Sequence, residues 1–178
     1  MRVNEYLEKF NELQEENTFR GQQWFGKRRE LVKEYSWAVP NEDVLIYLSE
    51  FESLIEAGAG NGYWAHLIEE RGVDVQAADI EPAYETYTRV ESGNILSDYD
   101  IRDNPVLMVW PPCDNDMAYD VVRSKPSHVL YVGERRGGCT ATDSFFDETE
   151  KHYGLVAKVD LPSYVGVHDN FYHYVRKV

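Results

Sequence analysis

Hydrophobic positions near the start of the chain recur at the spacing of an amphipathic helix. The residues Val3, Tyr6, Leu7, Phe10 and Leu13 recur with the three- to four-residue period of one helix face. Polar and mostly charged residues fill the positions between them. This pattern predicts a helix with one apolar face that packs against the rest of the protein.

Two further helices are predicted before residue 50. The first covers residues 22–35, where the apolar residues lie partly on one face: Trp24, Phe25, Leu31, Val32 and Tyr35. Pro40 ends the segment before it. Asn41 is a good N-cap for a following helix that begins with acidic residues. We therefore expect residues 1–50 to form an N-terminal helical extension that acts as a lid.

From residue 53 onward, short apolar runs alternate with helical patterns. Strands are predicted over residues 54–57, 73–79, 106–110 and 128–134, with a weaker one over 88–90. Helices are predicted over residues 63–71, 114–123 and 142–152. The runs at 155–161 and 170–177 have only a loop between them, which indicates an antiparallel hairpin. This order predicts an α/β fold with a mostly parallel sheet, in which residues 51–178 form one globular unit.

Composition and charge narrow the class of protein. The 178 residues are 43% hydrophobic and carry a net charge of −14, which suits a packed domain and disfavours nucleic acid as a partner without excluding it. The apolar runs are all too short to cross a bilayer, so we expect no membrane partner. The acidic N-terminus does not resemble a signal peptide, and the two cysteines suit a reducing compartment, so a cytoplasmic location is expected.

Three glycines at alternate positions stand between two acids. Gly58, Gly60 and Gly62 follow Glu56, and Asp79 ends the next strand. A glycine-rich turn lets a ligand approach the backbone and aims amide N–H groups at it. Dinucleotide-binding proteins use the spacing G-x-G-x-x-G for a pyrophosphate, which the carboxylate of Glu56 would repel. Glu56 suits an ammonium or sulfonium group, and Asp79 suits ribose hydroxyls. The ligand deduced is S-adenosylmethionine, and the alternative is another Rossmann-like protein that binds a different nucleotide or none.

The run EAGAGNG at residues 56–62 resembles the first motif of the class I S-adenosylmethionine-dependent methyltransferases, and the closing hairpin is similar to that family's last two strands. The resemblance covers about residues 53–178. It implies a Rossmann-like doubly wound, seven-stranded sheet, with S-adenosylhomocysteine as the product. It also implies that Glu56, Gly58, Gly60 and Asp79 bind the cofactor. Asn94 stands where family members often have an Asp that contacts the adenine amino group.

The aromatic residues nearest this loop are further candidates for the cofactor site. A ring face of Trp37 or Trp64 can attract a sulfonium. The alternative for each is packing in the core.

The fourth predicted strand ends in a Pro-Pro loop that we expect to border the transferred methyl group. Trp110, Pro111, Pro112 and Cys113 are similar to the Asp/Asn-Pro-Pro-aromatic motif of amino-methylating enzymes. In this chain Trp110 stands where that motif has its polar first residue, and Cys113 stands where it has its aromatic fourth residue. The exocyclic amine of a nucleic-acid base is therefore not inferred as the acceptor. The prolines stiffen the loop, and their carbonyls are expected to lack competing helix partners. Trp110, Pro111 and Pro112 are therefore catalytic candidates and Cys113 a substrate-binding one, the alternative being a simple proline stop.

Two more loops carry candidate chemistry. Glu134 ends a buried strand, and Arg135 and Arg136 are placed to clamp an anionic substrate group, unless they form a solvated turn. In the loop of the final hairpin, His168 stands beside an Asp and can serve as a catalytic base, unless it is simply exposed.

The two cysteines belong to the same region. Cys113 and Cys139 follow neighbouring strands, so they can approach each other at the site. Their spacing, with or without His168 and Asp169, matches no known zinc pattern, so no metal is predicted and two small buried thiols are favoured.

The function predicted from the sequence is a methyltransferase that uses S-adenosylmethionine. A small molecule is the preferred acceptor, because the net charge is acidic and the Pro-Pro loop lacks its usual anchor. The alternatives are an amino-methyltransferase acting on nucleic acid or protein, and a protein with this fold that binds without catalysis. The sequence specifies neither the acceptor atom nor the oligomeric state.

Overall fold

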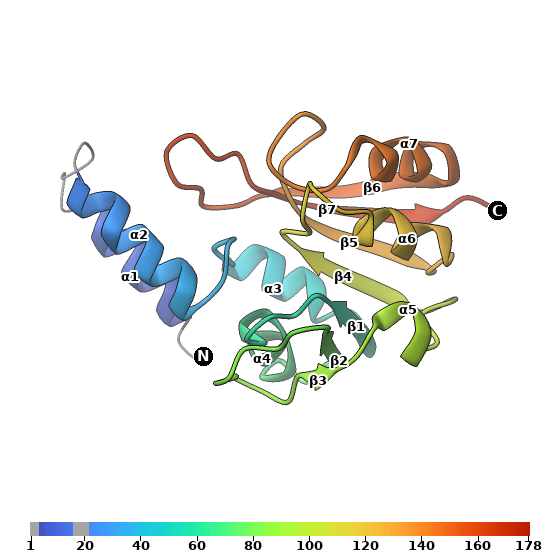
Figure 1. The fold of residues 1–178 in the computed structure, drawn as a ribbon, viewed down its shortest axis with the longest axis horizontal. Helices are drawn as coiled ribbons and strands as arrows, with labels where there is room; N and C mark the ends of the chain where they lie inside the picture. The colour runs from blue at the N-terminus through green and yellow to red at the C-terminus, as the bar shows by residue number, and fades with distance from the viewer. Residues whose placement is uncertain (1–3, 16–21) are drawn as a thin grey trace.

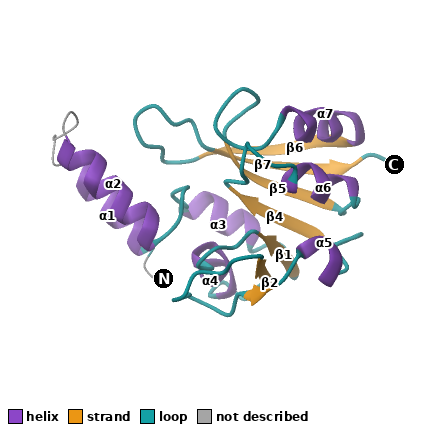
Figure 2. Cartoon of the chain, viewed as in Figure 1, coloured by secondary structure: helices purple, strands orange, loops and turns teal. Residues whose placement is uncertain are grey.

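The computed structural model describes residues 4–15 and 22–178 of the chain, and it forms a seven-stranded sheet with helices on both faces (Figures 1 and 2). The strands are β1 (Ser53–Ala57), β2 (Asp74–Asp79), β3 (Glu91–Ser92), β4 (Pro105–Val109), β5 (His128–Gly133), β6 (Tyr153–Asp160) and β7 (Asn170–Arg176). The helices are α1 (Glu5–Glu15), α2 (Gln22–Glu34), α3 (Glu42–Leu48), α4 (Tyr63–Glu69), α5 (Ile95–Asp98), α6 (Met117–Arg123) and α7 (Asp143–His152).

The strand order is β3-β2-β1-β4-β5-β7-β6, and only β7 runs antiparallel to its two neighbours. This confirms the predicted Rossmann-like sheet with an antiparallel C-terminal hairpin. The order reverses between β1 and β4, which are adjacent although β2 and β3 lie between them in the sequence. Ligands of such sheets bind beyond the carboxyl ends of the strands at this switch point. The loops after Ala57 and Val109 are therefore the first place to look for a site.

Alternating residues of each strand build two cores, one on each face of the sheet. Leu54 and Leu107 face the core that also contains α1–α4, whereas Ile55 and Val106 face the core formed with α5–α7. The central strands are buried on both sides, which explains why their sequences are continuous apolar runs and not alternating ones.

The N-terminal helices share a core with the sheet. In Figure 1, α1 and α2 lie side by side next to α3 and α4. Tyr6 of α1 is fully buried, stacks on Tyr35 with ring centroids 4.9 Å apart, and its hydroxyl is 3.1 Å from that of Tyr164 in the loop before β7. The hydroxyl of Tyr63 in α4 accepts a hydrogen bond from the backbone N–H of Tyr6. Val3 of the first predicted helix lies outside the described residues.

Local signals place most helix ends correctly. The side chain of Asn41 accepts a hydrogen bond from the N–H of Val44 at 3.0 Å and caps α3 as predicted. The predicted start of α6 at residue 114 is wrong. Residues 114–116 form a turn in which the Asn115 side chain accepts a hydrogen bond from the N–H of Met117.

The region between β2 and β4 differs more from the prediction. The third strand lies at Glu91–Ser92 and not at 88–90, since β2 pairs with residues 91 and 92. The short helix α5 was not predicted at all. Four residues are too few to show a helical period in the sequence.

Candidate functional site

The glycine loop after β1 owes its spacing to backbone conformation. Gly58, Gly60 and Gly62 all have left-handed φ angles, of 73°, 57° and 73°. A side chain is disfavoured in this conformation, so glycine at every second position follows from the way the chain turns from β1 into α4. A Cβ atom added at Gly60 would meet no atom within 4 Å, so the loop presents bare backbone to open space there.

The amide groups of this loop are used within the protein. The N–H groups of Gly58 and Ala59 donate to the carbonyl of Ala78, and that of Gly60 donates to Oδ2 of Asp79 at 2.9 Å. The N–H of Gly62 donates to Ala59. The expectation that these amides point at a ligand is therefore wrong. A loop whose donors are occupied offers little to a pyrophosphate, which agrees with the choice of a different ligand.

Glu56, at the end of β1, is a buried carboxyl group with an unused oxygen. Its exposed fraction is 2%, and Oε2 has no hydrogen-bond partner in the described part of the chain. Burial raises the pKa of Glu56 to about 8, and the charges of Asp79 and Glu69 add to this rise, against a hydrogen bond from the Ala65 backbone. A positively charged ligand beside Oε2 would reverse this shift.

A cavity of about 450 Å³ opens above the loop and brings several predicted residues together. Its wall includes Glu56, Gly58, Gly60 and Trp37. Asp79 adjoins it through the Gly60 hydrogen bond, and its other oxygen accepts the N–H of Glu81 at 2.8 Å. Each carboxylate oxygen can accept one more hydrogen bond. The arrangement thus leaves room for the predicted ribose contact.

Helix α2 contributes two cations to this cavity that sequence reasoning missed. Arg29 and Lys33 line it together with residues of the glycine loop, and neither forms a hydrogen bond or ion pair within the part of the chain that the structure describes. The helical spacing of residues 29 and 33, on one face of a predicted lid, is the only signal that the sequence contained. The cavity lining therefore includes both a carboxyl group and two cations.

Two predicted cofactor residues have structural contacts. The Asn94 side chain accepts a hydrogen bond from the N–H of Leu96 at 3.0 Å and caps α5, so the oxygen proposed for adenine already has a partner. Trp64 is 2% exposed, and its Nε1–H donates to Ser36 and Ala38. Trp64 therefore packs in the core, as its alternative predicted.

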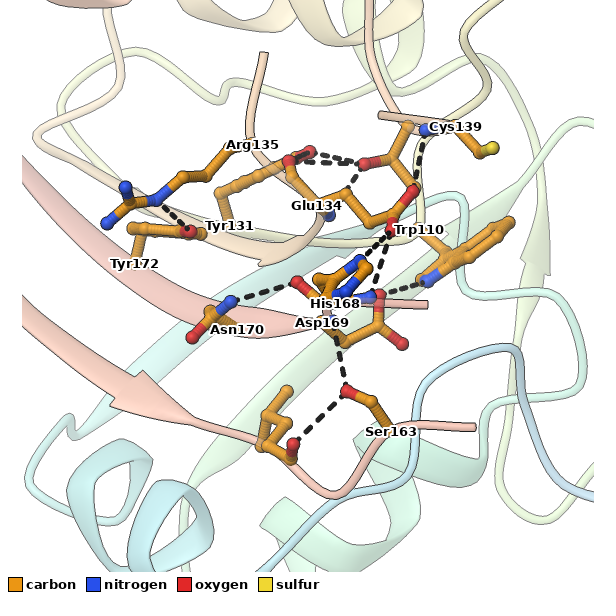
Figure 3. Close-up of polar contacts among 12 residues, drawn as sticks. Trp110, Tyr131, Glu134, Arg135, Cys139, Ser163, His168, Asp169, Asn170 and Tyr172 are labelled. Carbon is orange, nitrogen blue, oxygen red and sulfur yellow. Dashed lines mark hydrogen bonds and ion pairs between the residues drawn. The ribbon is translucent and has the colours of Figure 1, made fainter. Parts of the chain in front are cut away.

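Trp110, after β4, is held in an unusual conformation. Its φ is +54°, which is uncommon for a bulky residue. Its Nε1–H donates to Oδ1 of Asp169 at 2.7 Å, a contact visible in Figure 3. Its ring stacks on Trp37, with centroids 5.0 Å apart and planes inclined by 10°. Two distant segments of the sequence thus meet at the carboxyl end of β4.

The sequence did not indicate the role of Asp169 in the structure. This residue was considered only beside His168 and as a possible metal ligand, but it is 4% exposed and bonded to Trp110. Burial raises the pKa of Asp169 to about 6, while the Trp110 hydrogen bond opposes the rise and Glu134 adds to it. No local pattern marks this contact, because residues 110 and 169 are far apart in the sequence.

Glu134 links two loops. One oxygen accepts the N–H of Cys139 at 2.7 Å, and the other accepts the N–H of His168 at 2.9 Å. Burial raises the pKa of Glu134, but these hydrogen bonds outweigh it and hold the pKa below its ordinary value. The His168 ring is 84% exposed and lies 3.6 Å from Glu134, so its ion-pair partner is not the adjacent Asp169.

Arg135 and Arg136, predicted to clamp an anionic group together, contact different partners. Arg136 faces the acids of α7, with Asp147 at 2.8 Å and Glu150 at 3.5 Å. Arg135 instead donates to the hydroxyl of Tyr172 at 3.3 Å. Both arginines line a second cavity of about 560 Å³ with Glu134, Lys158, His168 and Asn170. Its lining residues differ entirely from those of the first cavity.

The Pro-Pro loop pairs with the loop after β5. Pro112 bridges Thr140 in antiparallel fashion, and the carbonyl of Pro111 accepts the N–H of Ala141 at 2.9 Å. The carbonyl of Pro111 therefore has a partner, which lies in a loop and not in a helix. Continuing the antiparallel register by one residue places Cys113 opposite Cys139.

Both thiols are exposed, which corrects the prediction that they are buried. Across residues 4–15 and 22–178, no three or more His, Cys, Asp and Glu side chains are grouped so as to hold a metal ion. Within the same ranges, no helix is both long enough and apolar enough to cross a membrane.

Neither a protein-family model nor a curated protein sequence matches the chain. Solved structures do match, all at low identity. A 1,6-didemethyltoxoflavin-N1-methyltransferase from Burkholderia thailandensis with bound S-adenosylhomocysteine is 13% identical, with a TM-score of 0.59, over 100% of this chain and 92% of that one. A magnesium protoporphyrin IX methyltransferase from Synechocystis PCC 6803 with bound S-adenosylmethionine is 11% identical, with a TM-score of 0.57, over 90% and 85%.

A putative transfer-RNA methyltransferase from Streptococcus pneumoniae is 11% identical, with a TM-score of 0.51, over 77% of this chain and 71% of that one. The chain therefore has the fold of the S-adenosylmethionine-dependent methyltransferases. Proteins of this fold act on acceptors as different as a porphyrin and an RNA, so the fold leaves the acceptor open.

Proposed function

We propose that this protein is a methyltransferase that binds S-adenosylmethionine in the cavity above the glycine loop. The observation that carries the proposal is the buried Glu56 with its unpartnered Oε2 at the wall of that cavity. A buried carboxyl group without a partner is costly unless a ligand completes it. S-adenosylmethionine, when bound, supplies an electrophilic methyl group on a positively charged sulfur.

The charged groups in the cavity lining fit a zwitterionic tail. Glu56 attracts the ammonium and sulfonium charges, while Arg29 and Lys33 face the place where a carboxylate would lie. Asp79 accepts hydrogen bonds from ribose hydroxyls in addition to its two backbone contacts. A pyrophosphate ligand is negatively charged and has no positive group for Glu56 to bind.

The N-terminal helices act in this proposal as a lid. Arg29 and Lys33 reach the cavity from α2, so a bound cofactor connects α2 to the glycine loop. Residues 1–50 would then serve binding and closure, and residues 51–178 would carry the loop chemistry. Closure excludes water from the sulfonium and holds the acceptor in line.

The acceptor in this proposal is a small molecule. The net charge of −14 is unfavourable for the phosphate contacts on which nucleic-acid binding depends. Trp110 replaces the polar anchor of the amino-methylating motif, and Cys113 replaces its stacking ring. Two structures of similar fold are named for small-molecule acceptors, magnesium protoporphyrin IX and 1,6-didemethyltoxoflavin.

Calorimetry with two ligands tests the cofactor proposal. S-adenosylhomocysteine carries the amino-acid tail, whereas 5′-methylthioadenosine has the same nucleoside without it. Arg29→Ala combined with Lys33→Ala should weaken S-adenosylhomocysteine by at least tenfold and leave methylthioadenosine unchanged, because an ion pair to a ligand contributes about 1.5–3 kcal/mol. Asp79→Asn should weaken both ligands. Lys151→Ala, an exposed lysine on α7, is the matched control and should change neither.

If wild-type protein binds neither ligand, the cofactor proposal is wrong. If both bind but no radiolabelled methyl group is transferred to any member of a metabolite, RNA or protein pool, the non-catalytic alternative replaces the enzyme. Transfer to RNA or protein, and not to small molecules, would identify the other alternative.

A further inference from the structure

We propose that the open face of Trp37 is the surface on which the methyl acceptor stacks, and that this acceptor is a planar heteroaromatic small molecule. In the same proposal, Asp169 is a positioning residue that fixes the surface through Trp110. This inference rests on the proposed function, since it names the substrate class of the same site.

The exposure of Trp37 is the first observation. Its exposed fraction is 55%, whereas Trp24 and Trp64 are each 2% exposed. Trp37 nevertheless belongs to the wall of the cavity above the glycine loop, with Val32 and Val109 as apolar neighbours. A large ring at a cavity mouth with apolar surroundings matches the binding of a flat ligand, because every aromatic ring has a face that stacks.

The backing of this ring is the second observation. Trp110 covers the opposite face of Trp37 almost in parallel, at 5.0 Å between centroids. With one face against Trp110, Trp37 presents its other face to a ligand. An indole fixed in this way loses little freedom when a ligand stacks on it, which favours affinity.

The strain at Trp110 is the third observation. A bulky residue in the left-handed region costs about 1–2 kcal/mol, and such conformations concentrate at ligand sites. Here the conformation is imposed by the backbone hydrogen bond from the Trp110 N–H to Val132 and by the indole hydrogen bond to Asp169. The strained backbone of Trp110 thus orients its indole against the ring of Trp37.

Asp169 is built into the structure so as to hold that indole. Its own N–H donates to the Ser163 hydroxyl at 3.0 Å, and its carbonyl accepts the N–H of Leu161. The charged groups around its carboxyl are Glu134, Arg28 and His168. A buried carboxylate oriented toward a single indole N–H has a fixed geometry, so it controls the tilt of Trp110 and, through stacking, of Trp37.

Quinoline and decahydroquinoline are the probes that test the proposal. They share one skeleton, but quinoline is planar and aromatic, whereas decahydroquinoline is a puckered amine that is protonated at pH 8. Binding to protein saturated with S-adenosylhomocysteine is measured by quenching of tryptophan fluorescence and by calorimetry. Quinoline should bind and decahydroquinoline should bind at least tenfold more weakly. Trp37→Leu should weaken quinoline by about tenfold, and Trp37→Phe by about threefold or less.

Phe25→Leu is the matched control, because Phe25 is an aromatic residue of α2 that is 61% exposed and does not line the cavity. It should leave quinoline binding unchanged. Asp169→Asn keeps a hydrogen-bond acceptor for Trp110 but cannot ionise. Wild-type fluorescence should change with a midpoint near pH 6, where Asp169 titrates, and the variant should lack that change while it still binds quinoline.

Each contrary result contradicts one part of the proposal. If S-adenosylhomocysteine does not bind, the proposed function fails; if it binds and quinoline does not, only the stacking surface fails. Tighter binding of decahydroquinoline would replace the planar acceptor by a cationic one. If Trp37→Leu weakens S-adenosylmethionine more than S-adenosylhomocysteine and leaves quinoline unaffected, Trp37 contacts the sulfonium and the stacking proposal is overturned. A pH midpoint that persists in Asp169→Asn removes Asp169 from the positioning role.

Discussion

Replacing Glu56 by Gln should remove the pH dependence of stability that this residue creates. The pKa of Glu56 rises from 4.5 to about 8 in the folded protein. Between these values the folded protein keeps a proton that the unfolded chain releases, so the free energy of unfolding falls as pH rises. At about 1.4 kcal/mol for each pH unit, the loss is up to about 5 kcal/mol. Reorganisation around an open cavity lowers the expected value to about 3 kcal/mol.

Urea unfolding followed by circular dichroism, at pH 5 and at pH 8.5 without ligand, measures this effect. Glu56→Gln should remove most of the wild-type loss between the two pH values, and at pH 8.5 the variant should be more stable than wild type. Glu52→Gln is the matched control, because Glu52 lies on the exposed side just before β1. It should preserve the wild-type pH dependence.

The same carboxyl group should report on the ligand. Because a cation favours the ionised form, S-adenosylmethionine should displace a proton from Glu56 at pH 7, which calorimetry in two buffers of different ionisation enthalpy detects. Glu56→Gln should release none. Equal pH dependence of stability in wild type and variant would show that Glu56 is not destabilised by burial, and the main support for the cofactor site would be lost.

Three further predictions follow from contacts elsewhere in the fold. Because Cys113 faces Cys139, oxidised glutathione should form an intramolecular disulfide, seen as loss of both free thiols by mass spectrometry without a dimer; Cys139→Ser should abolish it, and intermolecular products alone would contradict the register. His173 contacts His128 at 2.7 Å, and burial lowers the pKa of His173 from 6.5 to about 4. The free energy of unfolding should therefore fall by up to about 3 kcal/mol as pH drops through this window, because the unfolded chain binds the extra proton. His173→Gln should flatten that part of the urea-unfolding profile, and an unchanged slope would assign the loss to other groups. Asn41→Ala should cost about 1 kcal/mol in urea unfolding through loss of the α3 cap, whereas Asn41→Ser should retain most of it.

The local chemistry of the sequence determined the framework of this protein. Continuous apolar runs predicted the buried strands β4 and β5, and the alternation of strands with helices predicted a parallel sheet. Alternate glycines predicted the loop after β1, because left-handed backbone has a direct signature in residue type. Asn41 marked the start of α3 for a similar reason, since a cap acts within three residues of itself.

Patterns in the nearby sequence gave wrong predictions where the conformation depends on contact with a distant segment. The third strand is defined by its partner β2, so its own two residues carry almost no pattern. Residues 114–116 resembled a helix by composition, but the turn that follows the Pro-Pro loop occupies them. In both cases a neighbour in space, and not the sequence nearby, chose the conformation.

The sequence by itself determined the sheet, the glycine loop and the acid at its edge, because each depends on residues close together in the chain. Only the tertiary structure decided that Arg29 and Lys33 line the cavity above that loop, and that Trp110 bonds to Asp169 and stacks on Trp37. It also decided that the Glu134 carboxylate accepts hydrogen bonds from the backbone N–H groups of Cys139 and His168. These contacts join segments that only the packing of the helices and the antiparallel insertion of β7 bring together, and their distance in sequence hides them from any local pattern.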